Sequence, residues 1–285
     1  MLKRSGIRRF ASATTLGVAA LALGPIVADA ILVAPHAVFM DHRTRTGQVY
    51  LVNSGTEPEE VAIELKYGYP DADSTGNVYI HFFDAPTPDQ HSAAEWVRAF
   101  PRRVVVPPGA QQVVRLLATP PADLPDGEYW SRLIVTSHGA PVPVAGADSA
   151  VRAQITLEVR SILSLTYRKG VVHTGLTLRD FQATLRRDSL VVWLDLERTG
   201  NAAWLGTARL GLRDTGGQVA EHFSSQVAIY STPQRRRLAF PVTGVGPGVY
   251  TMTLELSTAR EDIPQGNILP AETIQRSVAL EVPVR

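Results

Sequence analysis

Residues Ile155 to Tyr167 read ITLEVRSILSLTY. Apolar and polar residues alternate at its start, at Ile155, Leu157 and Val159, and the apolar rhythm continues to Tyr167. This period of two predicts a strand with one apolar face. A loop rich in glycine, proline and alanine precedes it, from His138 to Ala150. A long strand after such a loop is either an ordinary core strand or an edge strand offered to a partner.

The N-terminus predicts export. It carries four basic residues: Lys3, Arg4, Arg8 and Arg9. An uncharged apolar stretch, Ala11 to Ala28, follows and ends in Ala28-Asp29-Ala30, which has the A-x-A pattern of a cleavage site. Residues 1–30 are therefore interpreted as a secretory signal peptide that is cleaved. A retained membrane anchor is the alternative, but the apolar run is short for a span of about 20 residues.

The composition limits what the remaining chain can be. It has no cysteine, so an exported protein of this kind depends on packed cores and not on disulfides. The formal net charge is only +1, which gives no indication of nucleic-acid binding. No second apolar run approaches the length of a membrane span, so no membrane insertion of the mature chain is expected.

Short apolar segments separated by Gly, Pro, Asn and Asp turns recur along the whole chain. About seven fall in the first half, among them 49–52, 61–67, 104–106, 112–117 and 129–135, and a similar series follows in the second, at 190–196, 208–212, 227–230, 237–240, 250–256 and 277–282. The pattern predicts an all-β protein of two immunoglobulin-like β-sandwich domains in tandem, at 31–168 and 169–285. Residues 70–96 are longer and more polar, and are expected to form an extended loop or a ragged hairpin.

Sequence motifs for catalysis or cofactor binding are absent. There is no H-E-x-x-H, no G-x-S-x-G and no glycine-rich phosphate loop. The stretch Asp71 to Asn77 starts like a calcium loop, but Phe82 stands where the bidentate Glu is needed, which favours a polar turn. The run Arg235 to Arg237 is interpreted as a solvated strand start. Neither enzymatic activity nor a metal or other cofactor is predicted.

Six short sequence motifs follow one another in the first half of the chain. They are APHAVF (34–39), GQVYLVN (47–53), PRRVVVPPG (101–109), QVVRL (112–116), LPDGEY (124–129) and the segment that ends LTYR (165–168). In this order they resemble the periplasmic pilus or fimbrial assembly chaperones, the PapD-like family, over about residues 31–170. The second half resembles that family mainly in its architecture.

The resemblance implies a mechanism and a set of residues. A pilus subunit is an incomplete sandwich, and the chaperone supplies the missing strand, which is donor-strand complementation. The resemblance places Ile155, Leu157, Val159 and Leu163 on the donor strand. It also implies an ion pair between Glu128 and Arg168 that braces the angle between the domains.

The sequence departs from the family at one site. The family holds the subunit's C-terminal carboxylate with an arginine and a lysine, and His36 and Ser164 stand at those two positions. Both can donate a hydrogen bond, but neither carries a permanent charge. Either a nearby Arg160, Arg168, Arg43 or Arg45 supplies the charge, or the anchoring differs.

The function that the resemblance implies is a periplasmic chaperone. It would bind pilus or fimbrial subunits and deliver them to an outer-membrane usher. Two alternatives stay open from the residues alone. One is a structural or adhesive two-sandwich protein in which 155–167 is a core strand, and the other is an exported module that binds a small molecule or glycan.

Overall fold

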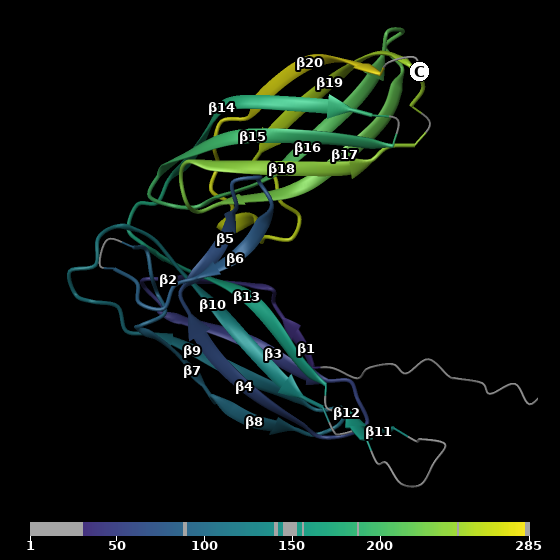
Figure 1. The fold of residues 1–285 in the computed structure, drawn as a ribbon. Helices are drawn as coiled ribbons and strands as arrows, with labels where there is room; N and C mark the ends of the chain where they lie inside the picture. The colour runs from purple at the N-terminus through teal and green to yellow at the C-terminus, as the bar shows by residue number, and fades with distance from the viewer. Residues whose placement is uncertain are drawn as a thin grey trace, which may run out of the picture.

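The computed structural model describes residues 31–87, 90–139, 142–144, 153–155, 157–186, 188–243 and 245–282, and the proposed signal peptide lies outside them. These residues form two β-sandwiches that follow one another along the molecule (Figure 1). The all-β, two-sandwich prediction is therefore confirmed. Within the described residues, no helix is long and apolar enough to cross a membrane.

The first sandwich is built from residues 31–169. Its strands are β1 (Ile31–Ala34), β2 (Ala37–Asp41), β3 (Thr46–Asn53), β4 (Glu59–Lys66), β7 (Val97–Phe100), β8 (Arg103–Val106), β9 (Gln111–Ala118), β10 (Gly127–His138) and β13 (Glu158–Lys169). One sheet has the order β1-β3-β9-β7, and the other has the order β2-β13-β10-β4-β8. Alternate residues of both sheets meet in one apolar core, which includes Val49, Leu51, Leu116 and Leu133.

Two small hairpins extend this sandwich. One pairs β5 (Gly68–Ala72) with β6 (Val78–Phe82), and the other pairs β11 (Val142–Val144) with β12 (Ala153–Ile155). The β5–β6 hairpin lies at the junction of the two sandwiches, and β11–β12 lies at the opposite end (Figure 1). Residues 70–96 thus contain the hairpin that their polar sequence allowed. At its tip, the Asp73 carboxylate accepts hydrogen bonds from the backbone amides of Thr75 and Asn77. The polar turn predicted for this stretch is therefore confirmed.

The second sandwich contains residues 174–282. Its strands are β14 (Thr174–Leu185), β15 (Ser189–Gly200), β16 (Trp204–Asp214), β17 (Val219–Ile229), β18 (Gln234–Pro241), β19 (Gly248–Ser257) and β20 (Ile274–Val282), with a short 3-10 turn, η1, at Gln265–Asn267. The sheets have the orders β14-β15-β18 and β17-β16-β19-β20. They enclose a second core around the fully buried Trp204.

The sequence patterns missed β14, and its geometry explains why. Its pairing with β15 shifts register between Leu178 and Asp180, as a β-bulge does. The apolar face therefore changes parity, from Leu176 and Leu178 before the bulge to Phe181 and Leu185 after it. A search for strict alternation does not find a strand interrupted in this way.

The stretch Ile155 to Tyr167 is not one strand, so that prediction is wrong. Its first residue ends β12 in a separate hairpin, where Ile155 pairs with Val142. Pairing with β10 begins only at Glu158. The two strands belong to different sheets, and local alternation cannot show such a change of partner.

Candidate partner-binding edge

Strand β13 has one edge that is only half used. Along its other edge it pairs with β10 over its whole length, from Glu158 to Lys169. Strand β2 pairs with it in parallel, but only over Ser164 to Arg168. Among the described residues, no strand pairs with β13 on that side between Glu158 and Leu163. The first six residues of β13 therefore form an open sheet edge.

The hydrogen bonds near β2 show which backbone groups face this edge. The Ser164 amide donates to the His36 carbonyl (3.2 Å), and the Arg168 carbonyl accepts from the His42 amide (2.9 Å). Even-numbered residues of β13 therefore point their N–H and C=O groups toward β2. Because these directions alternate along a strand, Arg160 and Ile162 present theirs to the open edge.

Side chains of β13 divide between two faces. Leu163, Leu165 and Tyr167 are at most 2% exposed and belong to the core of the first sandwich. The even-numbered side chains lie on the outer face, where Ile162 is 46% exposed. The assignment of Leu163 to the residues that fill a partner's groove is therefore wrong, because its side chain already fills this protein's own core.

The other three predicted donor residues stand differently. Val159 shares the face of Leu163 but is only half-buried. Leu157 precedes β13 and is 44% exposed. The backbone of Ile155 lies in β12, and its side chain is outside the described part of the structure. Leu157 and Val159 thus stay available as apolar contacts at the start of the open edge.

His36 and Ser164 do lie next to each other, at the point where β2 begins to pair with β13. The charge nearest to them in register was missed by the sequence analysis. It is Arg132 of β10, the cross-strand neighbour of Ser164. Arg132 is 6% exposed, donates Nε to the Gly68 carbonyl (3.1 Å) and lies 5.3 Å from the centre of the Tyr230 ring. Its buried Nη2 atom has no hydrogen-bond partner among the residues that the structure describes.

None of the four arginines suggested as substitutes is placed like Arg132. Arg160 is 65% exposed and pairs with Glu158, while Arg168 pairs with Glu128. Arg45 donates to the His42 carbonyl, and Arg43 is exposed in the turn after β2. Only strand register could have shown that Arg132 is the relevant side chain, and register is not visible in one sequence.

The predicted pair of Glu128 and Arg168 is in contact, with Arg168 Nε 2.8 Å from Glu128 Oε2. The Glu128 side chain is 1% exposed. Its other oxygen accepts from Trp130 Nε1 (2.7 Å) and from the backbone amide of Ala203 (3.1 Å). Since Ala203 directly precedes β16, one carboxylate links both sandwiches. Its role as a brace remains a prediction.

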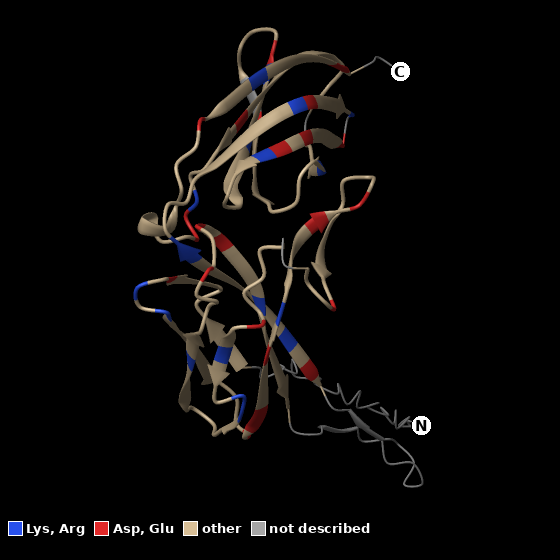
Figure 2. Ribbon diagram, turned by 90° about the vertical axis from the view of Figure 1, so that its left-hand side faces the viewer, with Lys and Arg blue, Asp and Glu red and all other residues tan. Residues whose placement is uncertain are grey.

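The β5–β6 hairpin makes a second link, which the sequence gave no reason to expect. Tyr69 stacks on Tyr230 with ring centres 5.7 Å apart and an interplanar angle of 5°. Asp71 accepts hydrogen bonds from Ser231 (2.8 Å) and Gln234 (2.6 Å). Figure 2 shows the hairpin reaching the second sandwich, and charges of both signs intermixed over both sandwiches.

The tip of this hairpin touches the arginine run. The Gly76 carbonyl accepts from the Arg237 amide (2.9 Å), and a Cβ on Gly76 would lie 2.7 Å from that nitrogen. Arg236 is 3% exposed, so the interpretation of the run as a solvated strand start is wrong for this residue. Burial lowers the pKa of Arg236 to about 10, while Asp71 raises it in part, so the side chain stays charged at neutral pH.

We expect acid to weaken the contact between the hairpin and the second sandwich. Burial raises the pKa of Asp71, but hydrogen bonds from Ser231, the Ala72 amide and Gln234 together outweigh it, so the pKa lies below the ordinary 3.8. A group with a lowered pKa in the folded state stabilises that state above its ordinary pKa. This contribution is lost as the pH falls below 3.8 and through the folded-state pKa.

Amide exchange of the hairpin and thermal unfolding, measured from pH 5 to pH 3, test this expectation. The Asp71→Asn variant keeps an acceptor oxygen but cannot titrate, so it should lack this part of the pH dependence. Identical pH profiles for the two proteins would contradict the assignment.

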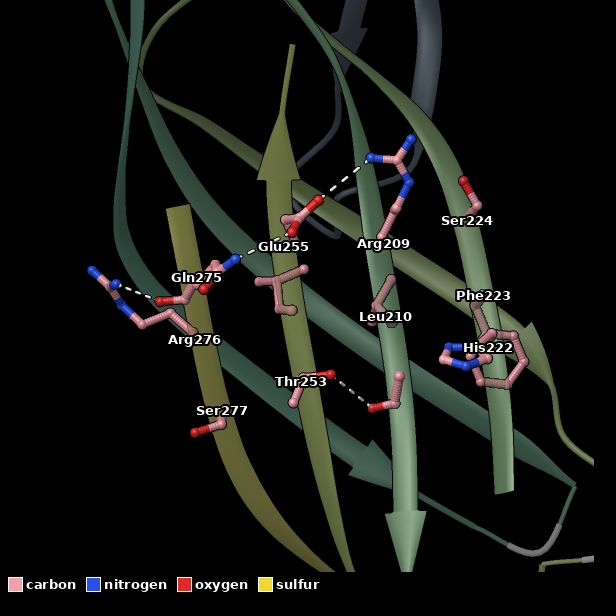
Figure 3. A pocket seen from close by; sticks show the side chains of 12 residues that line it. Arg209, Leu210, His222, Phe223, Ser224, Thr253, Glu255, Gln275, Arg276 and Ser277 are labelled. Carbon is pink, nitrogen blue, oxygen red and sulfur yellow. Dashed lines mark hydrogen bonds and ion pairs between the residues drawn. The ribbon is translucent and has the colours of Figure 1, made fainter. Parts of the chain in front are cut away.

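A hollow of about 1010 Å³ lies elsewhere, on the outer face of the sheet β17-β16-β19-β20 (Figure 3). Its polar groups already have partners within the sheet: Glu255 accepts from both Arg209 (3.4 Å) and Gln275 (3.2 Å), and Arg276 donates to the Gln275 carbonyl (2.7 Å). The described residues contain no cluster of three or more His, Cys, Asp or Glu side chains that could hold a metal ion. This open face gives no particular support to a ligand-binding module.

Comparison with known proteins gives a result only at the level of structure, since no family model and no curated protein match the chain. The CupB2 chaperone of Pseudomonas aeruginosa is 14% identical, with 86% of this chain and 98% of that chain covered and a TM-score of 0.40. The YadV chaperone is 15% identical, with 88% and 99% covered and a TM-score of 0.40.

A third similar structure is the CsuC–CsuE chaperone–tip adhesion subunit pre-assembly complex from Acinetobacter baumannii. It is 12% identical, covers 90% of this chain and 100% of that chain, and has a TM-score of 0.42. These chaperones are of the class that the ordered sequence motifs resemble.

Proposed function

We propose that this protein is a periplasmic chaperone that donates the open edge of β13 to a pilus or fimbrial subunit and delivers the subunit to an outer-membrane usher. One observation carries the proposal: within the described part of the chain, β13 is paired on both sides at Ser164–Arg168 but on one side only at Glu158–Leu163. The class of client and the usher follow from the resemblance of the ordered motifs. No cofactor is needed.

The physical basis is that the open edge of one sheet can complete another sheet that lacks a strand. A sandwich that lacks a strand exposes an apolar groove and two unpaired edges, which is an aggregation hazard. The outward N–H and C=O groups of Arg160 and Ile162 can continue the client's hydrogen-bond ladder. Leu157 and Val159 lie at the start of the same edge, where each apolar side chain buried by the client would contribute about 1.5–3 kcal/mol.

Strand β2 limits where the client can sit. Because β2 occupies the same edge from Ser164 onward, an added strand must end beside His36 and Ser164. If the added strand runs parallel to β13, its carboxyl end lies at this point. Arg132, one strand farther in, is the basic side chain placed to attract it, although Gly68 and Tyr230 already surround the guanidinium. We propose that Arg132 takes part in the anchoring.

The Arg160→Pro variant tests the proposed edge. The Arg160 N–H points away from β10, so proline removes a hydrogen bond to the client without removing one from the β10–β13 ladder. The ring also blocks the position that an added strand would take. We expect Arg160→Pro to lower by at least about tenfold the amount of subunit that co-purifies after co-expression with the exported proteins of neighbouring genes.

Arg160→Ala is the matched control, since it removes the same charge and keeps the N–H group. It should retain most of the capture. Circular dichroism and thermal unfolding check that both variants stay folded. Equal capture by the two variants would show that the edge is not used, and would favour a structural two-sandwich protein whose charged Glu158 and Arg160 merely protect an exposed strand.

A further inference from the structure

The outer face of the sheet beside the open edge is hollowed. A groove of about 550 Å³ lies between this face and the segment that follows the β5–β6 hairpin. Residues of β4, β10 and β13 line it on one side with Tyr67, and Phe82, Phe83, Asp84 and Pro86 line it on the other with Ala94 and Glu95. Arg160 and Ile162 line it on the side of the open edge. The groove and the edge are therefore continuous.

The apolar part of this groove lies at one register position. Ile162 is directly opposite Ile134 of β10, which is opposite Glu64 of β4. Ile134 is half-buried, while Ile162 is 46% exposed because none of the described strands lies beyond it. Phe82 and Phe83 contribute apolar surface to the opposite wall. An added strand would extend this row by one residue, next to Ile162.

We infer that the groove selects the added strand by a bulky apolar side chain opposite Ile162, so that the client is recognised on both of its faces. This inference rests on the proposed function. A residue directly opposite Ile162 has its side chain on the same face of the sheet, with Cβ atoms about 5 Å apart. An apolar side chain there covers Ile162 and points toward the groove. The inner face of the same strand meets Val159 and Leu157.

A second copy of this chain fits the edge less well. If two copies of β13 pair antiparallel over Glu158 to Ile162, Arg160 stands opposite the Arg160 of the second copy, and Ile162 stands opposite its Glu158. Like charges directly opposite one another destabilise a strand pair. Ile162 beside the Glu158 carboxylate of the second copy would not gain the stabilisation of an apolar contact. The edge therefore suits a foreign strand that is apolar at the position of Ile162.

Two peptides test the inference directly. Each has nine residues in which threonine and valine alternate, and the central threonine is replaced by leucine in one and by aspartate in the other. Binding to the full mature chain is followed by NMR titration of its amide resonances. We expect the leucine peptide to bind at least about tenfold more tightly, since burying one such side chain is worth about 1.5–3 kcal/mol. The shifts should centre on Arg160 and Ile162.

Three variants separate the possible explanations. Ile162→Ala should remove most of the preference for leucine, and Leu117→Ala, a change at a 44% exposed apolar residue of β9, should leave it intact. Arg160→Pro should weaken both peptides equally. Loss of both peptides in Arg160→Pro without any preference between them in the wild type would overturn the inference and leave the proposed function standing.

Other results are equally decisive. Binding of neither peptide, or binding that Arg160→Pro does not affect, would contradict the proposed function itself. Shifts confined to another sheet would do the same. A concentration-dependent dimer seen by light scattering, with Ile162 at its interface, would show that a second copy covers the groove and would overturn the inference.

Discussion

Replacing Leu163 by alanine is expected to lower the free energy of unfolding by about 2–5 kcal/mol, whereas the same change at Ile162 costs less than about 1 kcal/mol. The two residues are neighbours on β13 but lie on opposite faces. Leu163 is 2% exposed and faces Leu133, while Ile162 is 46% exposed on the outer face. Truncation of Leu163 leaves a cavity in a closed core, and truncation of Ile162 leaves none.

Urea unfolding of the two variants measures this difference, with unchanged slopes as the check that both remain two-state. The pair is a matched test of how β13 is oriented. Similar losses of stability at both positions would contradict the orientation and would reopen the assignment of Leu163 to a partner-facing role. The peptide titration adds a second measurement, since Ile162→Ala should reduce the preference for the leucine peptide far more than it reduces the stability.

Replacing Glu128 by alanine is expected to cost about 3 kcal/mol and to loosen the connection between the sandwiches. The change removes the acceptor of three donors: Arg168 Nε, Trp130 Nε1 and the Ala203 amide. Breaking a buried ion pair by removing one partner costs about 3–5 kcal/mol. We expect the lower end, because the Arg168 side chain is 16% exposed and can regain some hydration.

Thermal unfolding and small-angle scattering provide the two measurements, of stability and of the arrangement of the sandwiches. Glu197→Ala is the control, since it breaks the exposed pair with Arg179 in the second sandwich and should cost less than about 1 kcal/mol. Glu128→Gln should fall between the two, because it keeps an acceptor oxygen but not the charge. If the Glu128→Ala protein is as stable as the Glu197→Ala protein, Glu128 does not brace the two sandwiches.

Much of the fold follows from local patterns. Strands β3, β4, β9 and β10 each contain a run of apolar residues bounded by turn residues, and each was found from the sequence. Strand β14 was missed because a bulge changes the parity of its apolar face between Leu178 and Asp180. Strands β1 and β2 were missed because each is short and a proline lies between them.

The candidate site was only partly predictable. The pair of Glu128 and Arg168 was expected and is in contact, but the link of Glu128 to Ala203 joins positions 75 residues apart. Arg132 lies at the site because β10 and β13 pair in the register that puts it opposite Ser164, and the sequence does not show this register. Gly76 belongs to the predicted polar turn and has a φ of +88°, but its close contact with the backbone of Arg237 in the other sandwich could not be predicted from the sequence.

The sequence by itself determined the period-two rhythm, the turns and hence two sandwiches, because side-chain alternation and turn chemistry are local properties of the chain. It also marked Ile155 to Tyr167 as unusual. Only the tertiary structure decided that this stretch is split between β12 and β13, that Leu163 faces the core, and that Glu158 to Leu163 has an open edge. The reason is physical. A sheet edge is open where no other strand pairs with it, and the strands that pair with β13 come from distant parts of the sequence, so only the folded chain shows where pairing stops.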